Sequence, residues 1–361
     1  MVASEMQESK PTKTTIKDIA QAAGVTPTTV SLALNNRPGV SKKTREKIFR
    51  LAETLNYEPN FTARSLRSKR SYTLGLFMKN IADPFYPQLA KSISETANDC
   101  GYNVILCNVG DDVDLKVKHL KILRGKGVDG IIFTTMLDDD PYVIQLIEES
   151  FPFVTAVRHI HINGMNDQIV SVTVDNFSGA YQAIQHLYRL GHDRIGIIAG
   201  DERTSTMVDR TAGAGQALLD CGIEPDGKMI AKCNYSRKLA MAATRDFLAM
   251  KYRPSAFFAE DDTMAIGVRE AVLKAGLRIP EDIALVGFDD IDVAGITGIE
   301  LTTINQQIIE IGRLSVNLLV DRIEKKSAPL VSKIVLQPEL VIRKSCGFHL
   351  KGYRTDRVRV K

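Results

Sequence analysis

The sequence contains no tryptophan, and its five cysteines form no recognisable framework. They are odd in number, lie far apart and lack the spacing of metal ligands, which favours reduced thiols over disulfides or a zinc site. No run of about 18 apolar residues is present, so no membrane-spanning helix is expected. The first residues are polar and lack the apolar stretch of a secretory signal, which predicts a cytoplasmic protein.

Signatures of catalysis are missing as well. The chain has no G-x-S-x-G, no Walker loop and no G-x-G-x-x-G after a predicted strand, and GAGQAL resembles a glycine loop only weakly. The six histidines show no metal-binding spacing. We therefore predict that the protein is not an enzyme and has no catalytic residue, no cofactor and no metal.

Charge is distributed unevenly along the chain. Residues 1–72 carry 13 lysines and arginines against 6 acidic residues, and residues 343–361 carry 7 against 1. The stretch between them carries 27 against 36. A basic head on an acidic body suits a chain that places one end on a polyanion such as DNA. With 361 residues, 44% of them hydrophobic, two or three folded units are expected.

The segment 15–35, TIKDIAQAAGVTPTTVSLALN, predicts two short helices joined at a glycine. Gly24 permits the positive φ of a sharp turn, Thr26 can cap the second helix, and Pro27 suits its first position. Such a pair is a helix-turn-helix, whose second helix fits a DNA major groove. A purely structural helical hairpin is the alternative. A third helix is predicted at 42–55, capped by Ser41.

A short basic segment, FTARSLRSKR, follows the three helices. It has few apolar residues to dock on a core, and an isolated helix of this length is marginal in water. We expect residues 59–72 to form a hinge helix and linker that becomes ordered only with a partner.

From residue 72 onward, strand and helix patterns alternate, which is typical of parallel sheets covered by helices. The strand-like runs fall at 73–78, 103–108, 130–133, 153–157, 169–174, 194–200, 255–260 and 283–288. The helical patterns between them include 88–100, 113–126, 178–190, 210–221, 239–250 and 263–275. So many elements exceed one open sheet, so we predict two Rossmann-like lobes with a cleft at the carboxyl ends of the strands.

These features resemble the lactose-repressor/galactose-repressor (LacI/GalR) family over residues 14–346. The resemblance is carried by IKDIAQAAGV-x3-TVS, N-x2-ARSLR, DPFY, VDN-x2-GAY-x6-L-x3-GH-x-RIG, AEDD-x-MAIG, GLRIPEDIALVGFDD, LTTI-x-Q-x3-EIG and PELVIRKS. It implies a nucleoid-associated homodimer that binds a palindromic double-stranded operator, with repression as the expected role and activation as the alternative. It also implies a core like periplasmic sugar-binding proteins that takes a small effector. A solute-binding protein without DNA function is the alternative, but it has no use for residues 14–70.

The resemblance also implies a division of the chain. We expect a disordered arm at 1–13, the helix-turn-helix domain at 14–58, the hinge at 59–72 and the core at 73–346. Within the core, the N-lobe takes about 73–173 and 305–335, and the C-lobe about 174–304 and 336–346. The tail, 347–361, has no apolar period and is expected to be loose.

The DNA-contacting residues follow from the same comparison. In the family, base edges are read at the positions of Pro27, Thr28 and Leu32, although arginine is usual where Leu32 stands, so the operator sequence is not transferable. Side chains suited to phosphates are Thr15, Lys17, Thr29, Ser31 and Asn35. In the hinge, Ala63, Leu66 and Arg67 match the family's pattern, in which the leucine is a wedge in the minor groove. Packing of Leu66 on the core as a linker residue is the alternative.

The effector should meet an aromatic wall together with forked polar groups. The family places such groups at Asn80, Phe85, Tyr86, Arg210, Asp261 and Asp289, and Tyr235 can add a second aromatic wall. An inter-lobe salt bridge is the alternative role for Arg210, which we expect to open a helix. Asp261 stands where asparagine is common and Val157 where sugar-responsive members carry a carboxylate. A sugar, a phosphosugar and a nucleoside-like effector therefore all remain open, as does the direction of the response.

Overall fold

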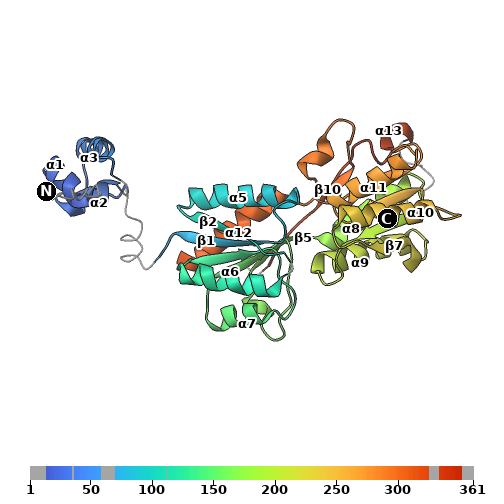
Figure 1. The fold of residues 1–361 in the computed structure, drawn as a ribbon, viewed down its shortest axis with the longest axis horizontal. Helices are drawn as coiled ribbons and strands as arrows, with labels where there is room; N and C mark the ends of the chain where they lie inside the picture. Colours follow the sequence, from blue (N-terminus) through green and yellow to red (C-terminus); the bar gives the residue numbers. More distant parts are fainter. Residues whose placement is uncertain (1–13, 35, 58–69, 111, 325–332, 352–361) are drawn as a thin grey trace, which may run out of the picture. The chain divides into compact units, whose positions relative to one another are not determined.

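The computed structural model describes residues 14–34, 36–57, 70–110, 112–324 and 333–351, which belong to two compact units (Figure 1). The first unit ends at residue 69 and the second begins at Arg70. The predicted N-terminal arm, Asn35 and the hinge residues Ala63, Leu66 and Arg67 lie outside the described residues.

The first unit is a bundle of three helices, α1 (Ile16–Ala23), α2 (Pro27–Leu34) and α3 (Lys42–Thr54). Thr15 and Asp18 form a capping box at the start of α1, and Gly24 ends it with φ of 70°. The hydroxyl of Thr26 accepts the Thr29 N–H (3.2 Å) at the start of α2. The buried side chains of the bundle are Ile19, Ala20, Ala23, Val30, Ala33, Ile48 and Ala52. The predicted helix-turn-helix is thus present.

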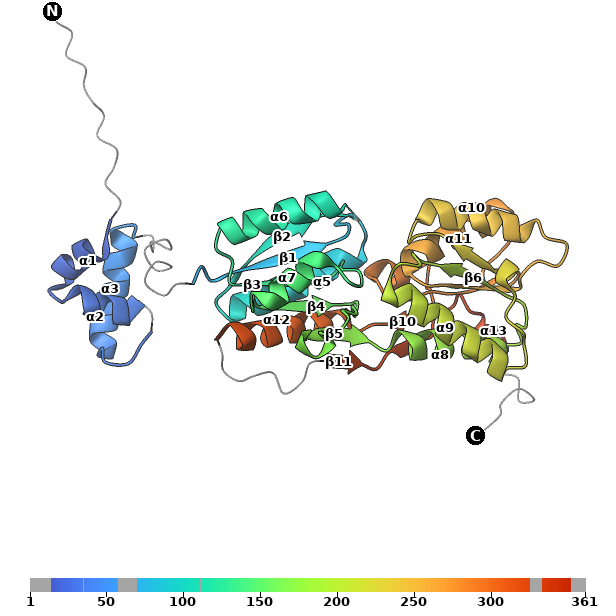
Figure 2. The ribbon, with the colours of Figure 1, turned by 90° about the horizontal axis from the view of Figure 1, so that it is seen from below.

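The second unit has two lobes. The N-lobe holds a six-stranded sheet in the order β11-β5-β4-β3-β1-β2, in which every pairing is parallel (Figures 1 and 2). Helices α5 and α12 pack on one face of it, and α6 and α7 on the other. The bounds are β1 Thr73–Met78, β2 Asn103–Asn108, β3 Gly130–Phe133, β4 Phe153–Ala156, β5 Ser171–Val174, β11 Lys333–Leu336, α5 Phe85–Asp99, α6 Val113–Gly125, α7 Pro141–Glu148 and α12 Ile308–Glu324.

The C-lobe holds a parallel sheet in the order β7-β6-β8-β9. Neighbouring residues of its central strands face opposite sides, and both sides are buried: Phe257 packs toward α10 and α11, and Phe258 toward α8 and α9. The bounds are β6 Ile195–Ala199, β7 Ile230–Lys232, β8 Ala256–Ala259, β9 Ala284–Val286, α8 Asn176–Arg189, α9 Ser205–Asp220, α10 Arg237–Leu248 and α11 Asp262–Lys274.

The chain passes between the lobes at three places: after β5, after β10 (Thr303–Asn305) and between β11 and β12 (Glu339–Val341). β10 and β12 pair antiparallel beside these crossings. This is the predicted two-lobed α/β core. Four short strands, β7, β10, β11 and β12, were not among the predicted runs.

The start of the tail differs from the expectation of a loose segment. Residues Phe348–Lys351 form the short helix α13, and the ring of Phe348 packs on the C-lobe core, 6.3 Å from the ring of His186. A single large apolar side chain anchors this turn, which is why no apolar period marks it in the sequence. Residues 352–361 lie outside the described part of the chain. No helix of the described residues is long and apolar enough to cross a membrane.

Candidate functional site

The predicted DNA-contacting residues that are described lie on α1 and α2, apart from Thr15, which directly precedes α1. Thr15, Lys17, Pro27 and Thr28 are exposed, whereas Thr29, Ser31 and Leu32 are half-buried. The hydroxyl of Thr15 donates to Asp18 (2.8 Å), so this predicted phosphate contact also serves as a helix cap. Their roles on DNA remain predictions.

A side chain that sequence reasoning did not single out fixes the end of α2. The guanidinium of Arg45, on α3, donates to the carbonyl oxygens of Ala33 (2.8 Å) and Arg37 (2.6 Å) and to Oδ1 of Asn36 (3.0 Å). These acceptors lie where helix α2 ends and its last carbonyls have no partner within the helix. Arg45 thus ties α2 to α3 and sets the orientation of the predicted recognition helix within the bundle.

The second unit contains a cavity of about 180 Å³ that is lined from both lobes. All seven predicted effector residues, Asn80, Phe85, Tyr86, Arg210, Tyr235, Asp261 and Asp289, line it. The other lining residues are Lys79, Asp83, Val157, Arg158, Thr206, Asn234 and Gln306. The geometry therefore brings the predicted set together, and its function as an effector site remains a prediction.

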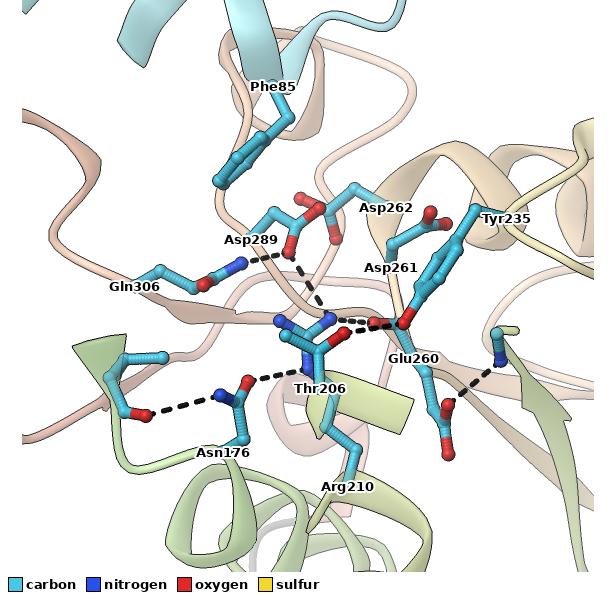
Figure 3. A network of polar contacts seen from close by, with 12 residues as sticks. Phe85, Asn176, Thr206, Arg210, Tyr235, Glu260, Asp261, Asp262, Asp289 and Gln306 are labelled. Atoms are coloured by element: carbon cyan, nitrogen blue, oxygen red, sulfur yellow. Dashed lines mark hydrogen bonds and ion pairs between the residues drawn. The ribbon is translucent and has the colours of Figure 1, made fainter. Parts of the chain in front are cut away.

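Arg210 lies at the centre of the C-lobe side of the cavity (Figure 3). Its Nε donates to Asn176 (2.8 Å), its Nη1 donates to the carbonyl oxygen of Glu260 and lies 3.5 Å from Oδ1 of Asp289, and its guanidinium lies 3.7 Å from the ring centroid of Phe288. All these partners belong to the C-lobe, so the contacts of Arg210 differ from the inter-lobe salt bridge considered above.

The position of Arg210 in its helix corrects the sequence prediction. Arg210 does not open a helix: α9 begins at Ser205, capped by the hydroxyl of Thr204, which accepts the N–H of Met207 (3.4 Å). Arg210 therefore lies in the second turn. The glycines after it, Gly213 and Gly215, lie within α9 and form no loop.

Buried carboxyl groups surround this arginine. Burial raises the pKa of Glu260 to about 7 and that of Asp261 to about 7, and it raises the pKa of Asp289 well above its ordinary value against the opposing charge of Arg210. Across the cavity, burial also raises the pKa of Asp83, which comes from the N-lobe and adds to the rise at Asp261. The cavity thus holds carboxyl groups that keep their protons more readily than exposed ones.

Asp261 and Asp262 are neighbours in the sequence but have different contacts. Asp261 caps α11 by accepting the N–H of Met264 (2.5 Å), while it also lines the cavity. Asp262 is fully buried and accepts from the hydroxyl of Thr303 (2.6 Å) and the N–H of Ile291 (3.1 Å). It thereby joins α11 to β10.

Gln306 is a cavity residue that the prediction missed. It follows β10 at a crossing between the lobes, is 1% exposed and donates to Oδ1 of Asp289. Its Oε1 is buried without a hydrogen-bond partner among the described residues. Such an acceptor is costly to bury unless a ligand or water donates to it. Its only trace in the sequence is the glutamine of LTTI-x-Q.

The backbone around the cavity contains several residues in the left-handed region. Val157 (φ 73°), Asn234 (52°), Tyr235 (59°) and Asp289 (121°) all have positive φ without being glycine. Each such residue costs roughly 1–3 kcal/mol, and such strain clusters at functional sites. The hydroxyl of Tyr235 is fixed by Thr206 (2.8 Å), and the Lys79 ammonium of the N-lobe lies 5.6 Å from its ring centroid.

A three-helix unit with a helix-turn-helix, followed by two parallel-sheet lobes that both line a polar cavity, defines a DNA-binding regulator with a ligand-binding core. Residues 15–60 match the family described as bacterial regulatory proteins, lacI family, and residues 71–339 match periplasmic binding proteins and sugar binding domain of LacI family. The chain belongs to the LacI family of transcriptional regulators.

Individual relatives agree with this assignment. The chain is 34% identical over 336 residues to the HTH-type transcriptional regulator DegA of Bacillus subtilis, covering 92% of this chain and 98% of the relative. It is 32% identical to the HTH-type transcriptional repressor PurR of Photobacterium profundum, with the same coverage. These relatives are regulators of transcription.

Solved structures are similar over the same length. The Lac repressor dimer bound to operator and the anti-inducer ONPF has a TM-score of 0.79 and 28% identity, with 92% of this chain and 99% of that chain covered. The transcriptional regulator CelR in complex with cellobiose has a TM-score of 0.70 and 31% identity, with coverage of 92% and 100%. The similarity thus extends over both units of the chain.

Proposed function

We propose that two copies of this chain grip a palindromic operator and that a small polar metabolite in the cavity changes how tightly they hold it. The observation that carries this proposal is the origin of the cavity residues. Phe85 and Tyr86 come from the N-lobe, Arg210 and Asp289 from the C-lobe, and Gln306 from a crossing between them. A ligand that contacts both lobes binds one relative arrangement of the lobes better than another, and that difference is what an allosteric effector needs.

The chemistry of the lining favours an effector rich in hydrogen-bond donors. Oε1 of Gln306 has no donor among the described residues, and Asp261 and Asp289 present further acceptors to the cavity. The edge-to-face pair Phe85 and Tyr86, with centroids 5.3 Å apart, offers an apolar wall against which a ring can pack. Hydroxyl groups on a small ring, as in a sugar or a related metabolite, satisfy both demands. We propose Asn80, Phe85, Tyr86, Arg210, Tyr235, Asp261 and Asp289 as effector-binding residues, with Gln306 added to them.

On the DNA side, we propose that Pro27, Thr28 and Leu32 face base edges. Leu32 has no donor for guanine, so apolar contact with a thymine methyl is the interaction open to it. Residues Thr15, Lys17, Thr29, Ser31 and Asn35 would contact phosphates, and Leu66 with Ala63 and Arg67 would enter the minor groove. We further propose that the protein works in the cytoplasm on chromosomal DNA and catalyses no reaction. Among the described residues, no group of three or more histidine, cysteine, aspartate or glutamate side chains could hold a metal ion.

The proposal is tested by selecting random duplex DNA with the full-length protein at low salt, raising the salt in successive rounds and sequencing the bound fraction. We expect a palindromic motif and a steep loss of affinity with salt. A Pro27→Ala, Thr28→Ala double variant should alter the motif, while Lys91→Ala, an exposed residue on α5, should leave it unchanged. Failure to enrich any motif would refute the DNA-binding function.

A further inference from the structure

The cavity contains a second buried arginine, Arg158, that forms no ion pair with the residues that the structure describes. Arg158 directly follows Val157 at the end of β4, is 5% exposed and lines the cavity. Three lysine or arginine residues are buried in the described part of the chain. Lys116 pairs with Asp140 at 3.2 Å, and Arg210 pairs with Asp289 at 3.5 Å. Arg158 has neither an ion pair nor a hydrogen bond to any described residue.

The absence of a partner matters because the cost of burying a charge is high. A buried cation is ordinarily paired and hydrogen-bonded, since it has lost its water and needs an acceptor in exchange. Arginine is also the side chain best suited to carboxylates and phosphates, because its planar fork donates two parallel hydrogen bonds to them. An unpaired, buried guanidinium at a cavity wall is therefore a site for an anionic group.

The carboxylates of the cavity have other donors. Asp83 accepts the N–H of Phe85 (3.1 Å), Asp261 caps α11, and Asp289 accepts from Gln306 and faces Arg210. Arg158 instead acts on two phenol groups from opposite lobes: its charge opposes the rise that burial causes in the pKa of Tyr86 and of Tyr235. An anion at Arg158 would thus share the cavity with the two tyrosines, and it would not need the donors that the carboxylates already use.

The backbone supports a positional role for Arg158. The residue before it, Val157, has φ of 73°, a conformation that β-branched side chains strongly disfavour. Its N–H still donates to the carbonyl oxygen of Val172 (2.9 Å), so the sheet continues up to this residue and the chain turns sharply there. The strained residue directs the chain at the point where Arg158 reaches the cavity.

We propose that the effector of this protein carries a carboxylate or phosphate group and that Arg158 binds it. This inference rests on the proposed function, because it takes the cavity to be the effector site. It narrows the effector from polar metabolites in general to anionic ones, such as sugar acids or sugar phosphates. Hydroxyl groups of the same molecule would meet Gln306 and the carboxyl groups at the other side.

The first test needs no effector. Arg158→Met keeps most of the aliphatic stem and removes the charge, so the unliganded protein should become more stable, with a melting temperature about 2–4 °C higher. Arg210→Met is the matched control: it removes a buried arginine that has partners, so its melting temperature should fall. A fall for Arg158→Met as well would show that the protein itself satisfies Arg158, and would overturn the proposal.

The second test uses simple anions. Replacing chloride by inorganic phosphate or by acetate at constant ionic strength should raise the melting temperature of the wild-type protein by about 2–4 °C and leave that of Arg158→Met unchanged. The anion that gives the larger rise distinguishes a phosphate from a carboxylate. Equal responses of the two proteins, or no response of either, would contradict an anion site at Arg158.

Glucose, glucuronate and glucose 6-phosphate then extend this test to the effector class by calorimetry. An anionic member should bind at least tenfold more tightly than glucose to the wild-type protein and lose that advantage in Arg158→Met. Tighter binding of glucose than of both anionic sugars would overturn the proposal. Operator selection with Arg158→Met tests the proposed function separately. If this variant selects the same DNA motif as the wild type, DNA binding is supported even where the anion tests fail. If it selects no motif, DNA binding is refuted even where the anion tests succeed.

Discussion

Substituting Glu260 by glutamine should remove part of the pH dependence of stability. Glu260 follows β8 and is fully buried; its Oε2 accepts the N–H of Gly200 (2.9 Å) and its Oε1 the hydroxyl of Thr211 (2.6 Å). Burial raises its pKa from 4.5 to about 7. Between pH 4.5 and about pH 7, Glu260 holds a proton in the folded protein that it has released in the unfolded chain. The contribution of Glu260 to stability is therefore greatest at acidic pH and falls as the pH rises.

The size of the effect follows from the same two values. A rise in pKa from 4.5 to about 7 corresponds to about 3 kcal/mol over the whole interval, of which about 2 kcal/mol falls between pH 5.5 and pH 7.5. Glutamine has the shape of the protonated side chain and does not ionise. Its Oε1 can accept the Gly200 N–H while its Nε2 donates to Thr211, so both contacts survive.

Urea unfolding followed by far-ultraviolet circular dichroism suits a chain without tryptophan. Between pH 5.5 and pH 7.5, the wild-type protein should lose about 2 kcal/mol of unfolding free energy relative to Glu260→Gln. Glu95→Gln, at an exposed position on α5, is the control and should follow the wild type. Parallel pH profiles for the wild type and Glu260→Gln would refute the assignment of a proton to Glu260.

Three further predictions concern packing and DNA. Gly213→Ala should destabilise the core by about 1–3 kcal/mol, because the new Cβ would lie 2.1 Å from the carbonyl oxygen of Phe177. Gly215→Ala, in the same helix, meets no atom within 4 Å and should be neutral or stabilising by up to about 1 kcal/mol. Thermal melting curves of the two variants test this difference. Arg45→Met should weaken binding to the selected operator roughly tenfold without touching a base, measured by fluorescence anisotropy, because the end of α2 loses its ties to α3. Leu66→Ser should reduce both the affinity for the operator and the bend angle of the DNA in a gel-based bending assay. An unchanged bend angle would refute the insertion of Leu66 into the minor groove.

The sequence predicted the elements with strong periodicity and missed the weak ones. β1, β2 and β3 fall at the predicted residues, because each is an apolar run between turn residues. β11 alternates between exposed and half-buried residues, and β7, β10 and β12 have three residues each. Strands so short are stabilised by partners far away in the chain, and a local pattern does not reveal such pairing.

The cavity shows the same division. Arg210 and Asp289 could be predicted from their motifs, and the structure places them within 3.5 Å of each other. Arg158 and Gln306 could not be predicted, because what distinguishes them is a buried polar group without a partner among the described residues: the guanidinium of Arg158 and Oε1 of Gln306. That property depends on every other side chain around the cavity, and it exists only once both lobes are folded. No local pattern of residue types encodes it.

The order of the strands has a consequence for synthesis. The N-lobe is the first lobe to emerge from the ribosome, yet its sheet ends with β11, which pairs with β5 and is made after the entire C-lobe sheet. The three-helix unit, by contrast, has its own core and is complete by residue 57. At roughly 5–20 residues per second, the delay between the two is on the order of tens of seconds. A nascent chain therefore possesses its DNA-contacting end well before it can respond to any metabolite.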